Sequence, residues 1–139
     1  METGAVISEC TATSGLLYVK SGTLNLNSLL NGNTDTTDAD RNVIGCTSQN
    51  GGLAYVNGGT LNLNNLITRF TASNGGAVSV ASGTCNMSAK DTSISYCTAS
   101  NGGGVYVGKS GTLNMDHEDA SIVNCTSTGN GGAICASGS

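Results

Sequence analysis

Asn74-Gly75-Gly76-Ala77-Val78-Ser79-Val80 is one copy of a pattern that recurs along this 139-residue chain. An Asn-Gly-Gly triplet opens each copy, and a short segment of alternating small or apolar side chains follows it. The triplets are Asn50-Gly51-Gly52, Asn74-Gly75-Gly76, Asn101-Gly102-Gly103 and Asn130-Gly131-Gly132. Self-similarity at a period of this size is typical of repeat architectures, in which each unit buries its apolar face against its neighbours.

Two further segments complete each copy. A Gly-Thr-Leu-Asn-Leu segment or a close variant occupies residues 22–26, 59–63, 83–87 and 111–115. A third segment, ending in Cys-Thr or Phe-Thr, occupies residues 7–11, 43–47, 67–71, 94–98 and 122–126. The turns between segments are too short for a crossover helix, so the strands can bury apolar side chains only by stacking on adjacent copies. We therefore predict an all-β fold, a single-stranded parallel β-helix (β-solenoid) with three short strands per rung and about four to five rungs.

The predicted solenoid is a single domain over residues 1–139, either a fragment or a self-stacking unit, with an inserted loop at residues 27–42. We expect right-handed winding from the general chirality of parallel connections. The chain starts beside a third segment and stops where a Gly-Thr-Leu-Asn segment is expected, and no polar cap is visible at either end. Two explanations stay open. The chain is a piece of a longer solenoid, or copies complete each other's rungs head to tail, which can build filaments.

Alternation along the strands assigns their faces, because successive side chains of a strand point to opposite sides. The predicted inward positions are Ala54, Val56, Val78, Val80, Val105 and Val107 in the first segments, and Leu24, Leu26, Leu61, Leu63, Cys85, Met87, Leu113 and Met115 in the second. The outward positions form a column of Tyr18, Tyr55, Ser79 and Tyr106, beside columns of Thr and Asn. Tyr18, Tyr55 and Tyr106 are a candidate ligand face, since aromatic rings stack on sugars, although such rows also stabilise their own ladder.

Composition excludes several classes of protein. The formal net charge of −4, with only five Lys and Arg, argues against a nucleic-acid partner. Polar residues interrupt every apolar stretch, so no membrane span is expected, and residues 1–3 show no signal-peptide head. We expect no enzyme and no cofactor. His117 is the only histidine, and the carboxylates do not form a facing pair on strands.

Four of the six cysteines share one column of the third segment. They are Cys10, Cys46, Cys97 and Cys125, with Phe70 in the central place. Neighbouring strands lie about 4.8 Å apart, which is within the Cα range of a disulfide. Bridges from Cys10 to Cys46 and from Cys97 to Cys125 are therefore feasible, and a ladder of reduced, buried thiols is the alternative. Cys135 falls in the outward tyrosine column and is the candidate intermolecular thiol in an oxidising environment.

Two further sets of residues suggest sites. The inserted loop is rich in oxygen ligands, so Asn31, Asn33, Asp35, Asp38 and Asp40 are weak calcium candidates. The EF-hand spacing is absent, however, and a solvated loop is the preferred interpretation, with no metal site expected. The triplets that begin at Asn86 and Asn124 match the glycosylation sequon, which also arises by chance in a chain rich in Asn and Thr.

The repeats resemble the right-handed β-helix repeats of surface adhesins and autotransporter passengers. The resemblance is carried by Gly75-Gly76-Ala77-Val78 and Gly131-Gly132-Ala133-Ile134, which are similar to the Gly-Gly-Ala-Ile block of the polymorphic outer membrane protein family. The companion Phe-x-x-Asn block of that family is absent, and Ile-x-x-Cys or Ile67-Thr68-Arg69-Phe70 stands in its place. The resemblance implies display at the cell surface and a role in adhesion or assembly.

Three functions follow as hypotheses. The preferred one is an extracellular or cell-surface structural β-solenoid that assembles head to tail into a fibre or stalk through uncapped terminal rungs. The second is an adhesin segment that binds a glycan or host surface protein through the tyrosine column or the loop at 27–42. The third is ice binding through the Thr and Asn face, since a flat array at strand spacing can order water.

Overall fold

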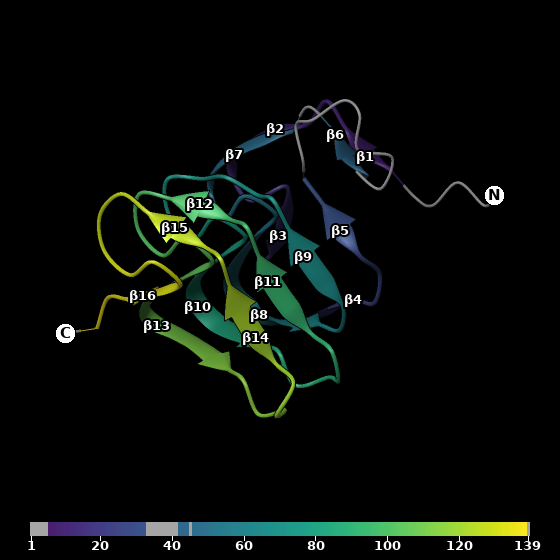
Figure 1. Ribbon diagram of the computed structural model, residues 1–139, viewed down its shortest axis with the longest axis vertical. Helices are drawn as coiled ribbons and strands as arrows, with labels where there is room; N and C mark the ends of the chain where they lie inside the picture. The colour runs from purple at the N-terminus through teal and green to yellow at the C-terminus, as the bar shows by residue number, and fades with distance from the viewer. Residues whose placement is uncertain (1–5, 33–41, 45, 139) are drawn as a thin grey trace.

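The computed structural model describes residues 6–32, 42–44 and 46–138, and within them the fold is all-β, with sixteen strands and no helix (Figure 1). The strands are β1 (Ile7–Ser8), β2 (Thr11–Ser14), β3 (Leu17–Val19), β4 (Thr23–Leu26), β5 (Leu30–Asn31), β6 (Val43–Ile44), β7 (Thr47–Asn50), β8 (Ala54–Leu63), β9 (Leu66–Thr68), β10 (Val78–Asn86), β11 (Ser93–Ser95), β12 (Thr98–Ala99), β13 (Val105–Asn114), β14 (Ser121–Val123), β15 (Thr126–Ser127) and β16 (Ile134–Ala136).

All strand pairs between the described strands are parallel, as the repeat pattern predicts. The largest sheet has the order β16-β13-β10-β8-β3, with β4 also paired to β8. A second sheet has the order β14-β11-β9-β5, and β1-β6, β2-β7 and β12-β15 form pairs of their own. Among the described strands, no sheet closes on itself. Most strands thus pair with the matching segment of the next repeat, and many pairs join like residues, such as Val78 with Val105 and Asn86 with Asn114. β9 is an exception, because it pairs with β5 inside the segment 27–42 and not with β6.

The first two segments are separate strands only in the first repeat, as β3 and β4, which differs from the expectation of three short strands per rung. In three successive repeats they merge into the single strands β8, β10 and β13. The ladder continues through the corner with a register shift between Val80 and Ser82. Gly83 at this corner has a φ of 88°, a conformation that costs glycine little. The chain therefore bends there without losing its pairing, as at a β-bulge.

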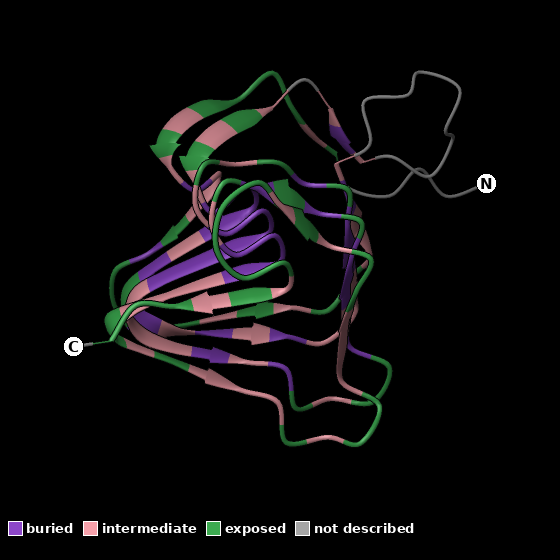
Figure 2. Cartoon of the chain, turned by 60° about the vertical axis from the view of Figure 1, so that its left-hand side comes forward, coloured by how far each residue is buried: buried purple, intermediate pink, exposed green. Residues whose placement is uncertain are grey.

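The core consists of the inward positions that alternation predicts (Figure 2). Ala54, Val56, Leu61, Leu63, Val78, Val80, Cys85, Met87 and Val105 are fully buried. The corresponding residues of the outermost repeats, Leu24, Leu26, Val107, Leu113 and Met115, are half-buried and pack against this cluster. Burial therefore depends on having a neighbouring repeat on both sides, because a single layer of strands has no interior of its own.

The Asn-Gly-Gly triplet has a separate physical reason at each glycine. Gly75 has a φ of 65°, which L side chains rarely adopt. Gly76 has no such φ, but a Cβ atom built on it would overlap the carbonyl oxygen of Gly103 in the next repeat. The same overlap would occur between Gly52 and the carbonyl oxygen of Gly76. The second glycine is therefore required by the close approach of two backbones.

We expect Gly76→Ala to lower the free energy of unfolding by about 1–3 kcal/mol, because the added methyl group forces adjacent backbones apart. Gly132→Ala is the matched control: it changes the same position of the triplet, but the nearest atom to its Cβ is the carbonyl oxygen of Cys125 at 3.8 Å. Urea unfolding of the dilute protein measures both. Equal destabilisation by the two substitutions would contradict the close-contact explanation.

Candidate functional site

An asparagine ladder runs along the outer face of the largest sheet. The amide nitrogen of Asn62 donates to the side-chain oxygen of Asn25 at 2.7 Å, Asn86 donates to Asn62 at 2.8 Å, and Asn114 donates to Asn86 at 2.8 Å. The ladder forms because the parallel register places these four residues side by side. All its bonds point the same way, from each repeat to the one before it. The ladder therefore has a direction. Asn25 at one end contributes only its side-chain oxygen to it, and Asn114 at the other end contributes only its amide nitrogen.

A second ladder consists of the asparagines that open the triplets. Asn74 donates to Asn50 at 3.0 Å, Asn101 donates to Asn74 at 3.2 Å, and Asn130 donates to Asn101 at 3.3 Å. The sequence pattern identified these residues only as the first position of each Asn-Gly-Gly triplet. Their recurrence at one position of every repeat was the signal for a ladder, since a column of identical amides bonds to itself at strand spacing.

The strands at the two ends of the array leave one edge unpaired among the described residues. At one end, β1, β2 and β3 pair only with β6, β7 and β8. At the other end, β14, β15 and β16 pair only with β11, β12 and β13. Figure 1 shows β5, β9, β11 and β14 side by side in this order, which follows the progression from one end to the other. Unpaired edges present backbone donors and acceptors to another strand.

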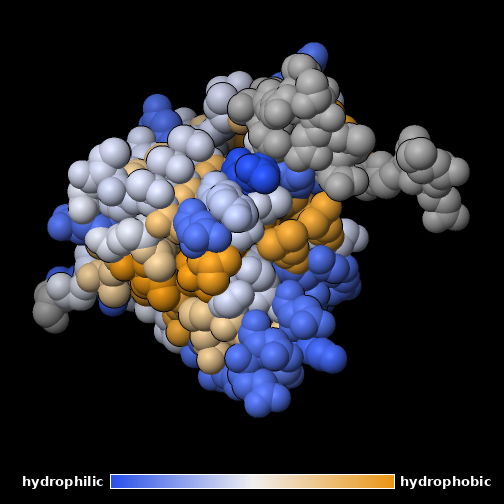
Figure 3. All heavy atoms as spheres, viewed as in Figure 1, coloured by the Kyte–Doolittle hydropathy of each residue, from blue (hydrophilic) through white to orange (hydrophobic). Residues whose placement is uncertain are grey.

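Apolar side chains accompany the unpaired edges. Ile134 lies in register with the fully buried Val105, yet it is 39% exposed because no strand covers it. Ile122 and, at the opposite end, Ile7 and Leu17 are half-buried. In the view of Figure 3, patches of apolar side chains reach the surface of the strand array and are bordered by polar side chains. Both ends thus combine backbone edges with incompletely buried core positions.

The tyrosine column is interrupted. Tyr18 and Tyr55 stack with their ring centroids 5.5 Å apart and their planes 12° from parallel. Ser79 follows in register but is only 2% exposed, so the predicted outward position is buried between its neighbours. The hydroxyl of Tyr106 forms a 2.8 Å hydrogen bond with the hydroxyl of Ser137. Part of the aromatic surface is therefore used within the ladder itself.

All six cysteines are free thiols, so the bridges from Cys10 to Cys46 and from Cys97 to Cys125 stay a prediction. The backbone N–H of Cys10 donates to the sulfur of Cys46 at 3.3 Å. Cys85 is fully buried in the core, as predicted, and burial raises the pKa of its thiol to about 12. Cys135 is half-buried and lies in register with Tyr106.

Cys97 and Cys125 are an asymmetric pair. Cys97 is fully buried, and its hydrogen bond to Cys125 together with burial raises the pKa of its thiol far above the ordinary value. The same hydrogen bond lowers the pKa of the half-buried Cys125 thiol to about 7. Because the thiolate is the nucleophile, Cys125 is the reactive member of the pair. Sequence alone placed the two in one column without distinguishing them.

Most of the calcium candidates, Asn33, Asp35, Asp38 and Asp40, lie outside the described residues. Asn31 is buried, and its backbone N–H donates to the side-chain oxygen of Asn42 at 2.9 Å. In the described part of the chain, no three His, Cys, Asp or Glu side chains form a group that could hold a metal ion.

The two sequon asparagines differ in their surroundings. Asn86 is half-buried, and its amide nitrogen, the atom that a glycan would modify, is a donor in the outer ladder. Asn124 is exposed and has a φ of 53°. Modification of Asn86 would therefore remove a ladder bond, whereas Asn124 has no such role.

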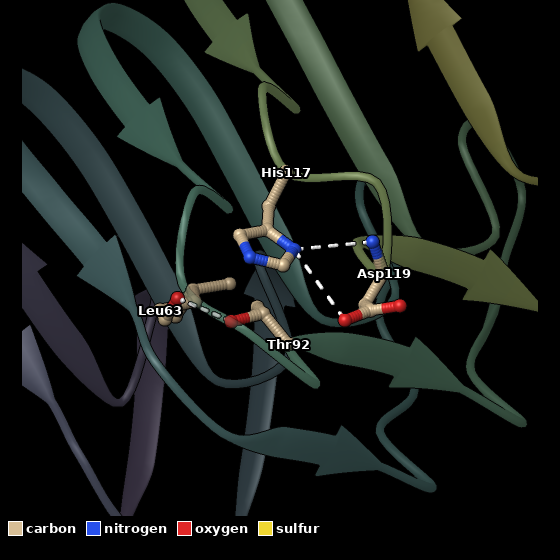
Figure 4. A network of polar contacts seen from close by, with 4 residues as sticks. All are labelled: Leu63, Thr92, His117 and Asp119. Carbon is tan, nitrogen blue, oxygen red and sulfur yellow. Dashed lines mark hydrogen bonds and ion pairs between the residues drawn. The ribbon is translucent and has the colours of Figure 1, made fainter.

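His117 makes a local contact within its own loop (Figure 4). The backbone N–H of Asp119 donates to Nδ1 of His117 at 3.1 Å, and a carboxylate oxygen of Asp119 lies 3.6 Å from the same atom. Both contacts therefore join His117 to Asp119 of the same loop. The buried Thr92 in the same view donates its hydroxyl to the carbonyl oxygen of Leu63 at 3.1 Å.

The sequence did not predict a left-handed backbone corner just before the column of Cys10, Cys46, Phe70, Cys97 and Cys125. Glu9, Arg69, Tyr96 and Asn124 all have φ values between 53° and 64°. Arg69 lies over the ring of the exposed Tyr96, with its guanidinium carbon 5.0 Å from the ring centroid. Each of these residues directly precedes Cys or Phe of the column, and that shared position was the signal in the sequence.

A cavity of about 540 Å³ lies between Thr47–Gln49 and Phe70–Ser73. Val43 and Cys46 also line it. It marks the place where β7 pairs with β2 but meets the repeat that follows only at its end. The contacts there are the bridge from Asn50 to Asn74 and backbone hydrogen bonds from Ser73 and Asn74 to the carbonyl of Gln49. The wall of strands is therefore open at this point.

Comparison with known proteins found no matching family model, no matching curated protein and no matching solved structure. Within the described residues, no helix has the length and apolar character needed to cross a lipid bilayer.

We expect Asn86→Ala to lower the free energy of unfolding by about 1–3 kcal/mol, because it removes two ladder bonds. Asn114→Ala is the control at the end of the ladder. It removes the one bond that Asn114 donates and is expected to cost about half as much. Urea unfolding measures both, and a cost for Asn114→Ala equal to that for Asn86→Ala would argue against the ladder as the cause.

Alkylation of Cys125 by iodoacetamide should increase with pH through about 7, where its thiolate forms. Cys97→Ala removes the hydrogen bond that lowers this pKa, so the increase should move to higher pH. Cys85→Ala removes another fully buried thiol, and it should leave the profile of Cys125 unchanged. Mass spectrometry of the Cys125 peptide gives each rate, and an unchanged profile in Cys97→Ala would refute the assigned cause.

Proposed function

We propose that this chain is an extracellular or cell-surface structural β-solenoid that assembles head to tail into a fibre or stalk. The observation that carries the proposal is the match between its two unpaired ends. β1, β2 and β3 present one free edge, and β14, β15 and β16 present the other, in the same order along the chain. The free ends of one copy thus offer the pairing that successive repeats already use within the chain.

Residue types agree across this contact. Stacking β1 on β14 brings Ile7 of one copy to Ile122 of another, and stacking β2 on β15 brings Thr11 to Thr126. Stacking β3 on β16 brings Leu17 to Ile134. Within the chain the same positions already pair isoleucine with isoleucine, as in Ile94 with Ile122, and threonine with threonine, as in Thr98 with Thr126.

The contact would bury core positions that the single chain leaves exposed. Covering Ile134 completes the burial that its neighbour Val105 already has. Burying a large aliphatic side chain contributes about 1.5–3 kcal/mol relative to leaving it exposed, and the parallel ladder adds backbone hydrogen bonds. Because the two ends are different surfaces, the contact is heterologous. Further copies then extend a filament, unless the rotation between successive copies closes them into a ring.

The solenoid itself is part of the proposal. Parallel pairing of each segment with its counterpart in the next repeat, together with a core filled by Val, Leu, Ile, Cys and Met, supports it. The resemblance to polymorphic outer membrane protein repeats and autotransporter passengers supports right-handed winding and surface display. Partners of this chain are then foremost other copies of itself.

Adhesion to a glycan or host protein is the second candidate, and exposed aromatic side chains favour it. Tyr18 is 50% exposed and Tyr96 is 54% exposed, with Arg69 stacked over Tyr96. Tyr96→Ala would weaken such binding in a glycan-array comparison. For ice binding, the amides of the outer ladder bond to one another, and a thermal-hysteresis measurement tests that hypothesis directly.

We expect the protein to form particles whose length grows with concentration, visible by electron microscopy and by light scattering coupled to size exclusion. Ile134→Lys should shift the equilibrium to the monomer, because it places a charge where the next copy must pack. Val123→Lys is the matched control, since Val123 is 43% exposed but has an outward position on β14. A wild-type protein that stays monomeric at high concentration would overturn the proposed function.

A further inference from the structure

We propose that Cys125 of one copy and Cys10 of the next form a disulfide that locks the head-to-tail contact covalently. This inference rests on the proposed assembly and names the modification at the same interface. It assigns the cross-link to a pair of thiols that belong to two different molecules, rather than to two repeats of one chain.

Register places the two residues opposite each other. At three places within the chain, the threonine after a column position donates its backbone N–H to the column residue of the repeat before it. Thr47 donates to the carbonyl of Cys10, Thr98 donates to Phe70, and Thr126 donates to Cys97, each at 2.9 Å. When β2 of the next copy continues this ladder on β15, its Thr11 donates to the carbonyl of Cys125. Cys10 then lies one strand spacing, about 4.8 Å, from Cys125, which is within the Cα range of a disulfide.

Accessibility favours this pair over the pair of Cys97 and Cys125 inside the chain. Cys10 is exposed at one free end, and Cys125 is half-buried at the other. Cys97 is fully buried. Besides its interaction with Cys125, its sulfur accepts the backbone N–H of Phe70 at 3.4 Å and lies 3.3 Å from the carbonyl oxygen of Ser95. The accessible side of Cys125 is therefore the free edge of β15, where the next copy would stack.

The same register argues against Cys135 as the intermolecular thiol. Cys135 pairs with Tyr106 inside the chain, on the outward face of β16. In the head-to-tail stack its counterpart on β3 is Tyr18, which has no thiol. The intermolecular role that sequence alone gave to Cys135 therefore belongs to Cys125.

The chemistry requires an oxidant, and a small-molecule disulfide such as oxidised glutathione supplies it. The thiolate of Cys125 attacks one sulfur of the small disulfide, whose S–S bond breaks and releases one small thiolate. Cys10 of the next copy loses its proton and attacks the Cys125 sulfur of the mixed disulfide, releasing the second small thiolate. Two protein thiols are oxidised by two electrons, and one small disulfide is reduced to two thiols. The lowered pKa of Cys125 supports its role as the attacking group.

The test is cross-linking of the assembled full chain in a buffer of reduced and oxidised glutathione, read on a non-reducing gel. We expect a ladder of dimers, trimers and longer species for the wild-type protein, for Cys135→Ser and for Cys97→Ser. Cys10→Ser and Cys125→Ser should each remain at the monomer position. A mixture of these last two variants should give dimers and no trimers, because each contributes one of the two thiols. Peptide mapping should identify a Cys10-to-Cys125 linkage.

The outcomes separate this inference from the proposed function. Assembly seen by light scattering without any ladder would overturn the cross-link and leave the assembly standing. A ladder that survives in Cys10→Ser, or that disappears in Cys135→Ser, would overturn the assignment of the two thiols. Absence of assembly under both reducing and oxidising conditions would overturn the proposed function and the cross-link together.

Discussion

The structure depends on one close contact, the approach of the glycine backbone in one repeat to the glycine carbonyl in the next. At Gly76 this approach leaves no room for a Cβ atom beside Gly103, and Gly52 repeats the contact with Gly76. Adjacent repeats can therefore lie at strand spacing around the corner as well as along the strands. Both asparagine ladders require that spacing, since hydrogen bonds of 2.7–3.3 Å between side-chain amides form only where the asparagines are in register. The absence of a side chain at these glycines thus makes possible the polar ladders on the outer surface.

Much of the fold was predictable because alternation and period are properties of the sequence itself. Val78 and Val80 were assigned to the interior, and both are fully buried. The merging of two segments into β8, β10 and β13 was not predictable. A glycine between two apolar segments predicts a strand break in the sequence, whether or not the pairing continues through that corner in the structure. The burial of Ser79 was missed for a related reason. Alternation gives the direction of a side chain but not the size of the tyrosines on either side of it.

The candidate site was predictable only at the level of columns. Sequence placed Cys97 and Cys125 in one column, but their difference in burial comes from their positions in the stack. Cys97 has a neighbouring repeat on each side and Cys125 has one, and the hydrogen bond between the two thiols shifts their pKa values in opposite directions. The left-handed corner at Arg69 and Tyr96 escaped detection because neither residue type favours that conformation. Tertiary stacking maintains the corner against the local preference.

The opening beside Phe70 has a mechanical consequence. β8 and β10 are joined by a long parallel ladder, whereas Thr47–Gln49 and Phe70–Ser73 line a cavity of about 540 Å³ and meet only near Gln49 and Asn50. A pull along the stacking direction loads every interlayer bond in parallel, so a layer with fewer bonds carries a greater load on each one. Under tension this side of the layer would part before β8 separates from β10.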